Sequence, residues 1–401
     1  MSEWRRAIDS YIESHADRWT GVRRHLHVHP EPSREEYATT RFLAGQLTES
    51  GVPVQIAPTG RGLIAEPDGQ GERERVAIRA DIDALRLQDA KSVPYRSSRD
   101  GFMHACGHDA HSAMVLAAAS ALTGVREALP KNTVWRAALQ PAEEIGEGAF
   151  EMIAAGAMEK VRAIAALHVD PDLESGRVAY RTGILTAHCQ EIAITIKGMG
   201  GHAARPHLSV DPIGVAVGLI NSIYQFVPRS LDSRDPTVIT FGCIEGGTSA
   251  NVIPEEVKLL GTIRTLSRGA AARVEDQVMR IARGFSEASR AAIEVTFRRG
   301  TDAVTNDPAV TATCVEAARE VVGAANVVEI PLPSMGGEDF SGYLKHAPGC
   351  LLRLGVAPAN GPRHFLHSPL FDIDEHALLL GAKVLAHSVV LLCHPCRSDA
   401  E

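Results

Sequence analysis

The chain has 401 residues, which at about 150 residues per domain is enough for two or three compact units with separate cores. Hydrophobic residues make up 45% and charged residues 22% of the sequence, and these ordinary proportions favour neither a disordered nor a fibrous chain. A net charge of -8 excludes a general attraction to the phosphate backbone of nucleic acids.

The amino-terminal segment predicts a helix and shows no secretion signal. Apolar residues recur at three- and four-residue spacing from Ile8 to Leu26, which predicts one amphipathic helix that ends before Pro30. The segment has no apolar core of a signal peptide, and no later run reaches the roughly 18 apolar residues of a membrane span. With seven cysteines, an odd number, we expect a cytoplasmic protein with reduced thiols and no membrane partner.

Short apolar runs that alternate with helical stretches predict the main domain. Ser33 and Glu36 have the spacing of a capping box, which predicts a helix that Gly51 closes. The expected buried strands are VAIRA (76–80), TVWRAAL (133–139) and AIAALHV (163–169), and the expected helices are SAMVLAAASAL (112–122) and FEMIAAGAM (150–158). This alternation predicts an α/β domain with a mostly parallel sheet covered on both faces.

A second domain is predicted from about residue 190, where EIAITIKG alternates apolar and polar residues. Its expected elements are strand 190–197, helix 211–227, strand 236–243, strand 255–263, helix 269–288 and strand 291–298. This is the order of a ferredoxin-like α+β unit. After Gly300 the α/β pattern returns, with a helix near 309–322, strands near 326–330 and 351–355, and a last helix from about Asp374. We therefore expect a discontinuous domain of 1–187 and 299–401, interrupted by an inserted domain of 188–298.

The densest cluster of chemically unusual residues is HACGHDAH at 104–111. Thiolate and imidazole bind zinc and related divalent metals, and Gly107 lets the backbone turn so that Cys106 and His108 can face one point. The structural alternative is an ordinary helix start at which Asp and His side chains serve as caps. Three histidines, a cysteine and an aspartate within eight residues favour the metal site.

Polar side chains also follow three of the predicted parallel strands. Glu143 and Glu144 follow TVWRAAL, His168 follows AIAAL, and Asp81 and Asp83 follow VAIRA. The carboxyl ends of parallel strands are the usual place of α/β active sites. One of two adjacent carboxylates can bind a metal while its neighbour acts as a general base. Each signal alone also fits a solvated acidic pair or a buried core residue, and their coincidence predicts a metal centre.

Further candidate residues lie in turns and at a strand end. His202 lies in the glycine-rich GMGGHAARPH, and Asn251 in IEGGTSANVIP can either bind substrate or cap its turn. Arg264 can hold a carboxylate or be an ordinary exposed strand residue. The segments MGGEDF (335–340) and HSP (367–369) are candidate site loops. Cys393 and Cys396 have redox or zinc spacing but stand at a tail without a partner motif.

These segments occur in the order of one known family. From about residue 20 to the last helix, RRHLHVHPEPSREE, ADIDAL, MHACGHDAHSAM, QPAEE, LHVDP, GMGGHAARPH, ANVIP, MGGEDF and HSP resemble the amidohydrolase branch of the aminoacylase and carboxypeptidase-G-type metallopeptidases. The resemblance implies a metal-binding domain in two segments and an inserted domain that serves as a lid and dimer interface. The implied activity is hydrolysis of the amide bond of N-acyl amino acids by a homodimer.

The resemblance also implies roles for individual residues. Two divalent cations, zinc, manganese or cobalt, are bound by the implied ligands Cys106, His108, Glu144, His168 and His367. Glu143 is the implied general base for the attacking water, and Asp83 orients a ligand. His202 reaches the site of the other subunit and stabilises the oxyanion. Asn251 and Arg264 are expected to bind the substrate's amide and carboxylate, and Asp81 is not counted as a ligand.

Other functions stay open on the sequence alone. The same fold and metals can serve a dipeptidase, an arylamine deaminase or a detoxifying amidase. A non-catalytic binding protein is a second class. The presence of Glu143 beside five ligands argues against it, because binding alone needs no base. A thiol redox protein based on Cys393 and Cys396 is the third.

Overall fold

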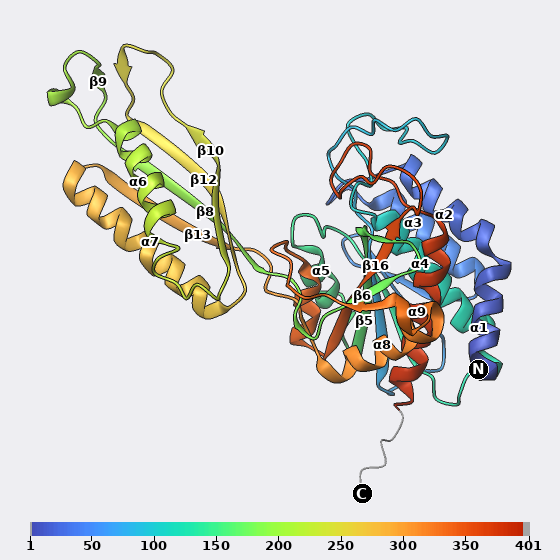
Figure 1. The fold of residues 1–401 in the computed structure, drawn as a ribbon. Helices are drawn as coiled ribbons and strands as arrows, with labels where there is room; N and C mark the ends of the chain where they lie inside the picture. The colour runs from blue at the N-terminus through green and yellow to red at the C-terminus, as the bar shows by residue number, and fades with distance from the viewer. Residues whose placement is uncertain (1, 396–401) are drawn as a thin grey trace, which may run out of the picture. The chain divides into compact units, whose positions relative to one another are not determined.

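A computed structural model describes residues 2–395, which form two compact units. Unit 2 consists of Thr186–Val304 and Pro333–Glu338, and unit 1 of the remaining described residues. The chain therefore passes between the units four times. Residues 333–338 were predicted to belong to the first domain, whereas the structure places them with unit 2. The colour ramp of Figure 1 follows the chain through both units.

Unit 1 is built around an eight-stranded sheet of order β1-β2-β4-β3-β5-β16-β6-β15. Its strands are β1 (Val54–Ile56), β2 (Leu63–Ala65), β3 (Arg75–Asp81), β4 (Trp135–Gln140), β5 (Val161–Glu174), β6 (Val178–Tyr180), β15 (Val327–Glu329) and β16 (Gly349–Ala357). The central strands β4, β3, β5 and β16 run parallel. Every residue of β3 and β4 is buried, as parallel strands with covered faces should be. The predicted mostly parallel sheet is confirmed.

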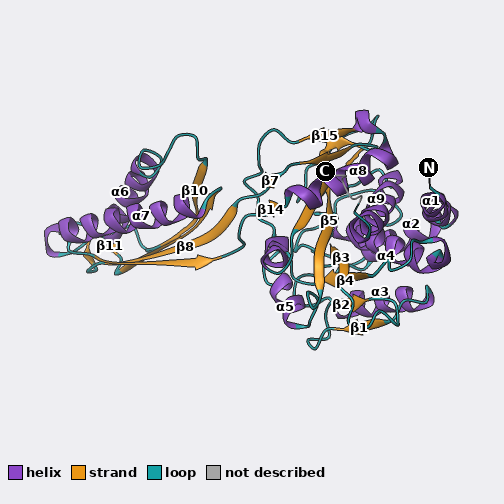
Figure 2. Cartoon of the chain, turned by 90° about the horizontal axis from the view of Figure 1, so that it is seen from below, coloured by secondary structure: helices purple, strands orange, loops and turns teal. Residues whose placement is uncertain are grey.

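Helices cover both faces of this sheet. The helices of unit 1 are α1 (Glu3–Ser14), α2 (Ala16–Val28), α3 (Tyr37–Glu49), α4 (His108–Gly124), α5 (Gly148–Ala154), α8 (Pro308–Val322) and α9 (His376–Cys393), with the short turns η1 (Arg126–Ala128), η3 (Ala324–Asn326) and η4 (Asp339–Lys345). Figure 2 shows α4 and α9 on one face and α5 on the opposite face. The strands β7 (Gly183–Ile184) and β14 (Thr305–Asn306) pair as a small ribbon.

The last helix, α9, is apolar along most of its length. Of the described helices, it alone has the length and composition to cross a membrane, and 72% of that window is buried inside the protein. It packs against α4 and α8 and contributes Leu378, Leu385 and Val389 to the core. Packing in the core accounts for its composition.

The predicted single amino-terminal helix is wrong, because it divides into α1 and α2 at His15. The His15 Nδ1 atom is 2.8 Å from the carbonyl oxygen of Tyr11, and the His15 backbone leaves the helical conformation. A side chain that bonds the last carbonyls of a turn competes with helix propagation. The apolar spacing did not reveal the break, since both helices bury their apolar faces in the same core.

The predicted capping box before α3 is also wrong. Neither Ser33 nor Glu36 bonds the first amides of the helix, and both side chains bind elsewhere, as described below. The cap is the carboxylate of Glu31, which accepts hydrogen bonds from the backbone amides of Ala38 at 3.2 Å and Thr39 at 2.7 Å. An acidic side chain at this place also suits the positive end of the helix dipole.

Unit 2 is a four-stranded antiparallel sheet of order β10-β12-β8-β13 with two helices. In chain order its elements are β8 (His188–Lys197), α6 (Pro212–Phe226), β10 (Thr237–Glu245), β12 (Glu256–Thr265), α7 (Arg268–Ser289) and β13 (Ala292–Arg299). A separate core forms where α6 and α7 pack on the inward residues of the sheet, among them Ile194 and Leu259. The predicted ferredoxin-like order is confirmed. A short ribbon pairs β9 (Gly201–His202) with β11 (Val252–Ile253), and η2 (Pro206–Leu208) follows β9.

Candidate metal centre

The HACGHDAH segment lies where α4 begins, and Gly107 makes its turn possible. Gly107 has a φ of +85°, in the left-handed region, and a side chain there would collide with Val169. Glycine alone adopts this conformation without steric cost and leaves the space that Val169 fills. This bend of the backbone places Cys106 just before α4 and His108 in the first turn of the helix. The geometry agrees with the expectation that Gly107 lets these two residues face one point.

All five predicted metal ligands come together in two groups. In one group a ligand atom from each of Cys106, His108 and His168 lies within 4.8 Å of the others, and in the second group the same holds for Cys106, Glu144 and His367. Cys106 belongs to both groups. The described residues therefore offer two adjacent sets of donors that share one sulfur atom.

Asp83 orients two of these ligands at once. The His108 Nδ1 atom lies 2.9 Å from the backbone oxygen of Asp83 and 3.2 Å from its Oδ1 atom, which leaves Nε2 facing the other ligands. The second carboxylate oxygen accepts hydrogen bonds from the Ser33 hydroxyl at 2.7 Å and the Glu144 backbone amide at 3.1 Å. A carboxylate behind an imidazole fixes its tautomer and orientation, as a metal-binding histidine needs.

His168 is oriented in a similar way by the backbone. Its Nδ1 atom is 2.8 Å from the carbonyl oxygen of Val169, so the Nε2 atom is left to face Cys106 Sγ, at 3.6 Å. Burial lowers the pKa of His168 well below its ordinary value, helped by the nearby Arg353. The neutral ring has a lone pair at Nε2, which is the form that binds a cation.

Two buried atoms of the site have no hydrogen-bond partner among the described residues. They are Nε2 of His108 and Oε1 of Glu144, which lie 3.8 Å apart. Buried polar atoms without a partner are costly and rare. Burial also raises the pKa of Glu144 to about 7 and that of the Cys106 thiol well above its ordinary value. A divalent cation would satisfy these atoms and favour the charged forms of both groups, so the residues fit a metal.

A third close group, Asp81, His108 and His111, has a different character. The His111 Nδ1 atom is 2.6 Å from Asp81, and its Nε2 atom accepts a hydrogen bond from the Val169 amide at 2.9 Å. Both ring nitrogens are therefore engaged, which excludes His111 as a ligand in this arrangement. Asp81 also accepts a hydrogen bond from Arg79 at 2.7 Å. This role of Arg79 was not predicted, although a charged residue inside the buried VAIRA strand is a signal for it.

His367 and Glu143 complete the centre. His367 has a φ of +62°, unusual for a residue with a side chain, and its amide donates a hydrogen bond to Ala105 at 2.8 Å. Its Nε2 atom is 3.7 Å from Glu144. The Oε2 atom of Glu143 lies 4.0 Å from Nε2 of His108. Backbone strain of this kind persists where surrounding contacts enforce it, as in active sites.

The remaining predicted site residues lie in unit 2. His202 pairs with Val252 across the β9–β11 ribbon, and the carbonyl oxygen of Asn251 accepts a hydrogen bond from the Ala203 amide at 3.1 Å. His202 and Asn251 are both exposed and lie at the same end of the unit. Arg264 lies near the far end of β12, opposite Val238 and Cys189. The structure therefore brings His202 and Asn251 together and leaves Arg264 apart.

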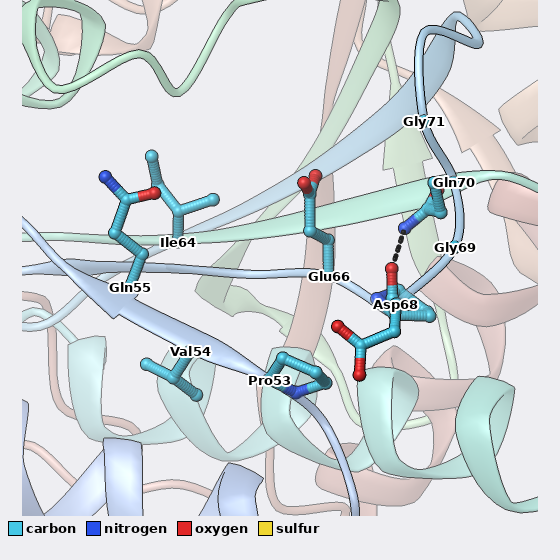
Figure 3. Close-up of a pocket in the computed structure, with 10 residues that line it drawn as sticks. Pro53, Val54, Gln55, Ile64, Glu66, Asp68, Gly69, Gln70 and Gly71 are labelled. Carbon is cyan, nitrogen blue, oxygen red and sulfur yellow. Dashed lines mark hydrogen bonds between the residues drawn. The ribbon is translucent and has the colours of Figure 1, made fainter.

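Two other features contain none of the predicted site residues. The pocket in Figure 3 lies at the sheet edge formed by β1 and β2, and its Glu66 is paired with Arg75 and Arg136, each at 2.8 Å. Cys393 donates a hydrogen bond to the Val134 carbonyl. Its predicted companion, Cys396, lies outside the described residues.

The chain is similar to a known protein family, to curated relatives and to solved structures. Residues 77–390 match the model of peptidase family M20/M25/M40. The chain is 39% identical over 369 residues to a probable hydrolase of Synechocystis sp., covering 92% of this chain and 93% of that protein. It is 37% identical over 368 residues to N-acetyl-L-cysteine deacetylase of Bacillus subtilis, covering 92% of this chain and 86% of that protein. It also resembles the crystal structure of a Bacillus subtilis protein described as a dinuclear metal binding peptidase of the M20 family, with a TM-score of 0.82, 33% identity, and coverage of 96% of this chain and 99% of that chain.

Proposed function

This chain belongs to peptidase family M20/M25/M40, and from that premise we propose that it hydrolyses the amide bond of N-acyl amino acids with Glu143 as general base. The family and the relatives identify it as a metal-dependent hydrolase of amide bonds. The substrate class and the roles of individual residues belong to the proposal.

One observation carries the proposal: two groups of donor atoms share Cys106, and Glu143 stands beside them. The similarity to a deacetylase of N-acetyl-L-cysteine over 92% of this chain supports an N-acyl amino acid as the substrate. The proposed ligands are Cys106, His108, Glu144, His168 and His367. A mixed sulfur, nitrogen and oxygen donor set accommodates zinc, manganese or cobalt.

The proposed reaction assigns separate tasks to the two adjacent glutamates. When bound, two divalent cations supply Lewis acidity that lowers the pKa of the attacking water and polarises the amide carbonyl. Glu143 removes the proton from this water and passes it to the leaving amine nitrogen. Asp83 holds the His108 ring and the Glu144 backbone in place during the reaction. Glu144 keeps both carboxylate oxygens for binding.

The inserted unit has a proposed part in this reaction. His202 stabilises the oxyanion, Asn251 binds the substrate's amide, and Arg264 binds its carboxylate. We propose a homodimer formed through unit 2, because its edge strand β10 exposes Val238 and Ile244, and α6 exposes Val217 and Tyr224. Exposed apolar side chains on an unpaired strand edge and a neighbouring helix suit a second copy of the same surface.

The thiol ligand also bears on location. The described cysteines are all free, and four of them are buried: Cys106, Cys189, Cys314 and Cys350. Because a thiolate ligand must stay reduced, this chemistry suits a reducing compartment. A cytoplasmic location is therefore part of the proposal.

Removal and restoration of metal test the proposal directly. The purified protein is treated with a chelator, its metal content is measured, and zinc, manganese or cobalt is added back. Hydrolysis of acetyl-, benzoyl- and indole-acetyl-amino acids is followed alongside dipeptides and simple arylamides. We expect loss of hydrolysis without metal, recovery with one of the cations, and a preference for N-acyl amino acids. Full activity in verified metal-free protein would refute the mechanism, and a preference for dipeptides would refute the substrate class.

A further inference from the structure

Glu36 is a buried carboxylate to which the proposed reaction gives no task. It lies just before α3 and is 0% exposed. Its Oε1 atom accepts a hydrogen bond from the backbone amide of Ala142 at 2.8 Å. Its Oε2 atom has no hydrogen-bond partner among the described residues, and the nearest cation is Nη1 of Arg61, at 3.7 Å. Burial raises the pKa of Glu36 to about 7, so keeping an ionisable group here is costly.

The partner of Glu36 is a strained residue next to the two site glutamates. Ala142 has a φ of +53°, in the left-handed region, where a side chain crowds the following carbonyl oxygen. Its own carbonyl oxygen accepts hydrogen bonds from the amides of Glu147 at 3.2 Å and Gly148 at 3.1 Å. The chain thus reverses tightly at Ala142, and the direction of Glu143 depends on this turn.

Two carboxylates hold this turn from the protein interior. Glu36 binds the amide of Ala142, and Asp83 binds the amide of Glu144, at 3.1 Å. The two bonded amides flank Glu143 on either side in the sequence. Each carboxylate accepts the hydrogen of one of these amides, so the two together fix the backbone on both sides of Glu143.

A simple role for Glu36 in starting α3 does not explain its position. The first amides of that helix are bonded by Glu31, and the Glu36 side chain makes no cap to its own helix. Its side chain instead reaches across 106 positions of sequence to Ala142. The contact that it makes is therefore with the loop of the metal centre.

We propose that Glu36 is a positioning residue, which holds Ala142 in its left-handed conformation and thereby fixes the carboxylate of Glu143 beside the metal ligands. This inference rests on the proposed role of Glu143 as the general base. A misplacement of about 1 Å in a reacting group can lower a rate roughly 100-fold. The effect of Glu36 should therefore appear in kcat rather than in substrate binding.

The first test compares two variants of Glu36 that have a similar side-chain volume: one lacks the hydrogen-bond acceptor for the Ala142 amide, and the other keeps it. Glu36→Met keeps the volume of the side chain and removes the bond to Ala142. We expect kcat for an acetyl-amino acid to fall roughly 10- to 100-fold, with KM and metal content within about twofold of wild type, as the inference requires. Glu36→Gln keeps a carbonyl acceptor for the Ala142 amide, and we expect its kcat to stay close to that of the wild type.

The second test relieves the strain itself. Glycine adopts positive φ without steric cost, so Ala142→Gly removes the need for an outside group to hold this conformation. We expect the double variant Glu36→Met with Ala142→Gly to recover part of the kcat that Glu36→Met loses. A role of Glu36 in general stability predicts no such recovery, because glycine adds freedom to the unfolded chain and lowers stability further.

Glu31→Met is the matched control, because Glu31 is a glutamate of the same loop that caps α3 and does not contact the turn at Ala142. It should lower the melting temperature and leave kcat unchanged. If Glu36→Met does not fold, Glu36→Asp is used, since its shorter side chain cannot reach Ala142, and a folded Glu36→Asp protein with wild-type kcat overturns the inference. Wild-type kcat in Glu36→Met, beside an inactive Glu143→Gln, overturns this inference alone. Wild-type kcat in Glu143→Gln overturns the proposed function as well.

Discussion

At the scale of the residue, the adjacent carboxylates of Glu143 and Glu144 occupy different surroundings. Glu144 lies 3.7 Å from His367 and 3.8 Å from His108, with one oxygen that lacks a hydrogen-bond partner among the described residues. Glu143 lies 4.0 Å from His108 and forms a close group of donor atoms with His108 and Glu144. The two glutamates differ because Glu144 also joins Cys106 and His367 in a further group of donors, which does not include Glu143.

This difference predicts opposite phenotypes for two isosteric substitutions. Glu143→Gln should lower kcat by about 10²- to 10⁴-fold and keep metal content near wild type, because the residue moves protons and does not bind the cation. Glu144→Gln should lose metal. Both are measured on the same preparations, with metal content by elemental analysis and kcat at saturating substrate. Loss of metal in Glu143→Gln, with loss of kcat but normal metal content in Glu144→Gln, would mean that the roles of base and ligand are assigned the wrong way round.

The part of the site that could be predicted from the sequence consists of motifs whose residues are close together in the chain. The approach of Cys106 and His108 follows from three consecutive residues and a glycine turn, and the positions of Glu144 and His168 follow from the ends of buried strands. The supporting contacts could not be predicted in this way. Glu36 bonds Ala142 across 106 positions of sequence, and Ser33 bonds Asp83 across 50. No periodicity in the sequence marks either pair. Ser33 and Glu36 were therefore interpreted as a capping box.

At the scale of the element, Arg23 of α2 joins two segments that carry proposed metal ligands. It is 0% exposed and donates hydrogen bonds to Asp109 at 2.9 Å, Asp372 at 2.8 Å and Glu375 at 3.1 Å. Asp109 follows His108 at the start of α4, and the other two acids lie between His367 and α9. A planar guanidinium with several donors suits such a junction.

Arg23→Met should therefore destabilise unit 1 by about 3 to 5 kcal/mol, because it leaves buried carboxylates without their main partner. Urea unfolding followed by tryptophan fluorescence measures this, since Trp4, Trp19 and Trp135 all lie in unit 1. The neighbouring Arg24→Met is the control. Arg24 is half-exposed and bonds only Glu375 among these acids, and an exposed pair contributes about 0 to 1 kcal/mol. Equal effects of the two substitutions would contradict the role given to Arg23.

The same scale shows which elements were predictable. Strands β3 and β4 and the six main elements of unit 2 follow directly from their apolar patterns. The division of α1 from α2 does not, because the apolar stripe continues across His15 while a single side-chain bond to Tyr11 ends the helix. The start of α4 at His108 rather than after the motif was also missed, since the left-handed Gly107 already begins the helical turn.

At the scale of the whole molecule, the proposed function requires groups from both units. The proposed metal ligands lie in unit 1, and His202 and Asn251 lie at one end of unit 2. We propose that His202 acts in the site of a second copy. His202→Ala should then bind metal normally and lose about 10²- to 10³-fold in kcat, the usual cost of removing one oxyanion donor.

Mixed dimers test this proposal. A heterodimer of one His202→Ala subunit and one Glu143→Gln subunit has one site in which Glu143 and a His202 supplied by the other subunit are both intact. We expect this sample to recover up to half the activity of wild type, whereas each mutant homodimer stays inactive. Differentially tagged subunits confirm that the heterodimer forms. If it forms without any recovery, His202 does not act across an interface.

The interrupted path of the chain also sets an order in which the protein can mature during synthesis. The six main elements of unit 2 are contiguous, so they can fold once residue 304 has left the ribosome. The central sheet must wait, because β5 at Val161–Glu174 pairs with β16 at Gly349–Ala357, and α9 follows later still. A nascent chain that stops before β16 therefore exposes a bare apolar strand edge and the uncovered side of α4, which are features that recruit chaperones or lead to aggregation. His367 emerges after all the other proposed ligands, so the proposed metal centre becomes complete only near the end of translation.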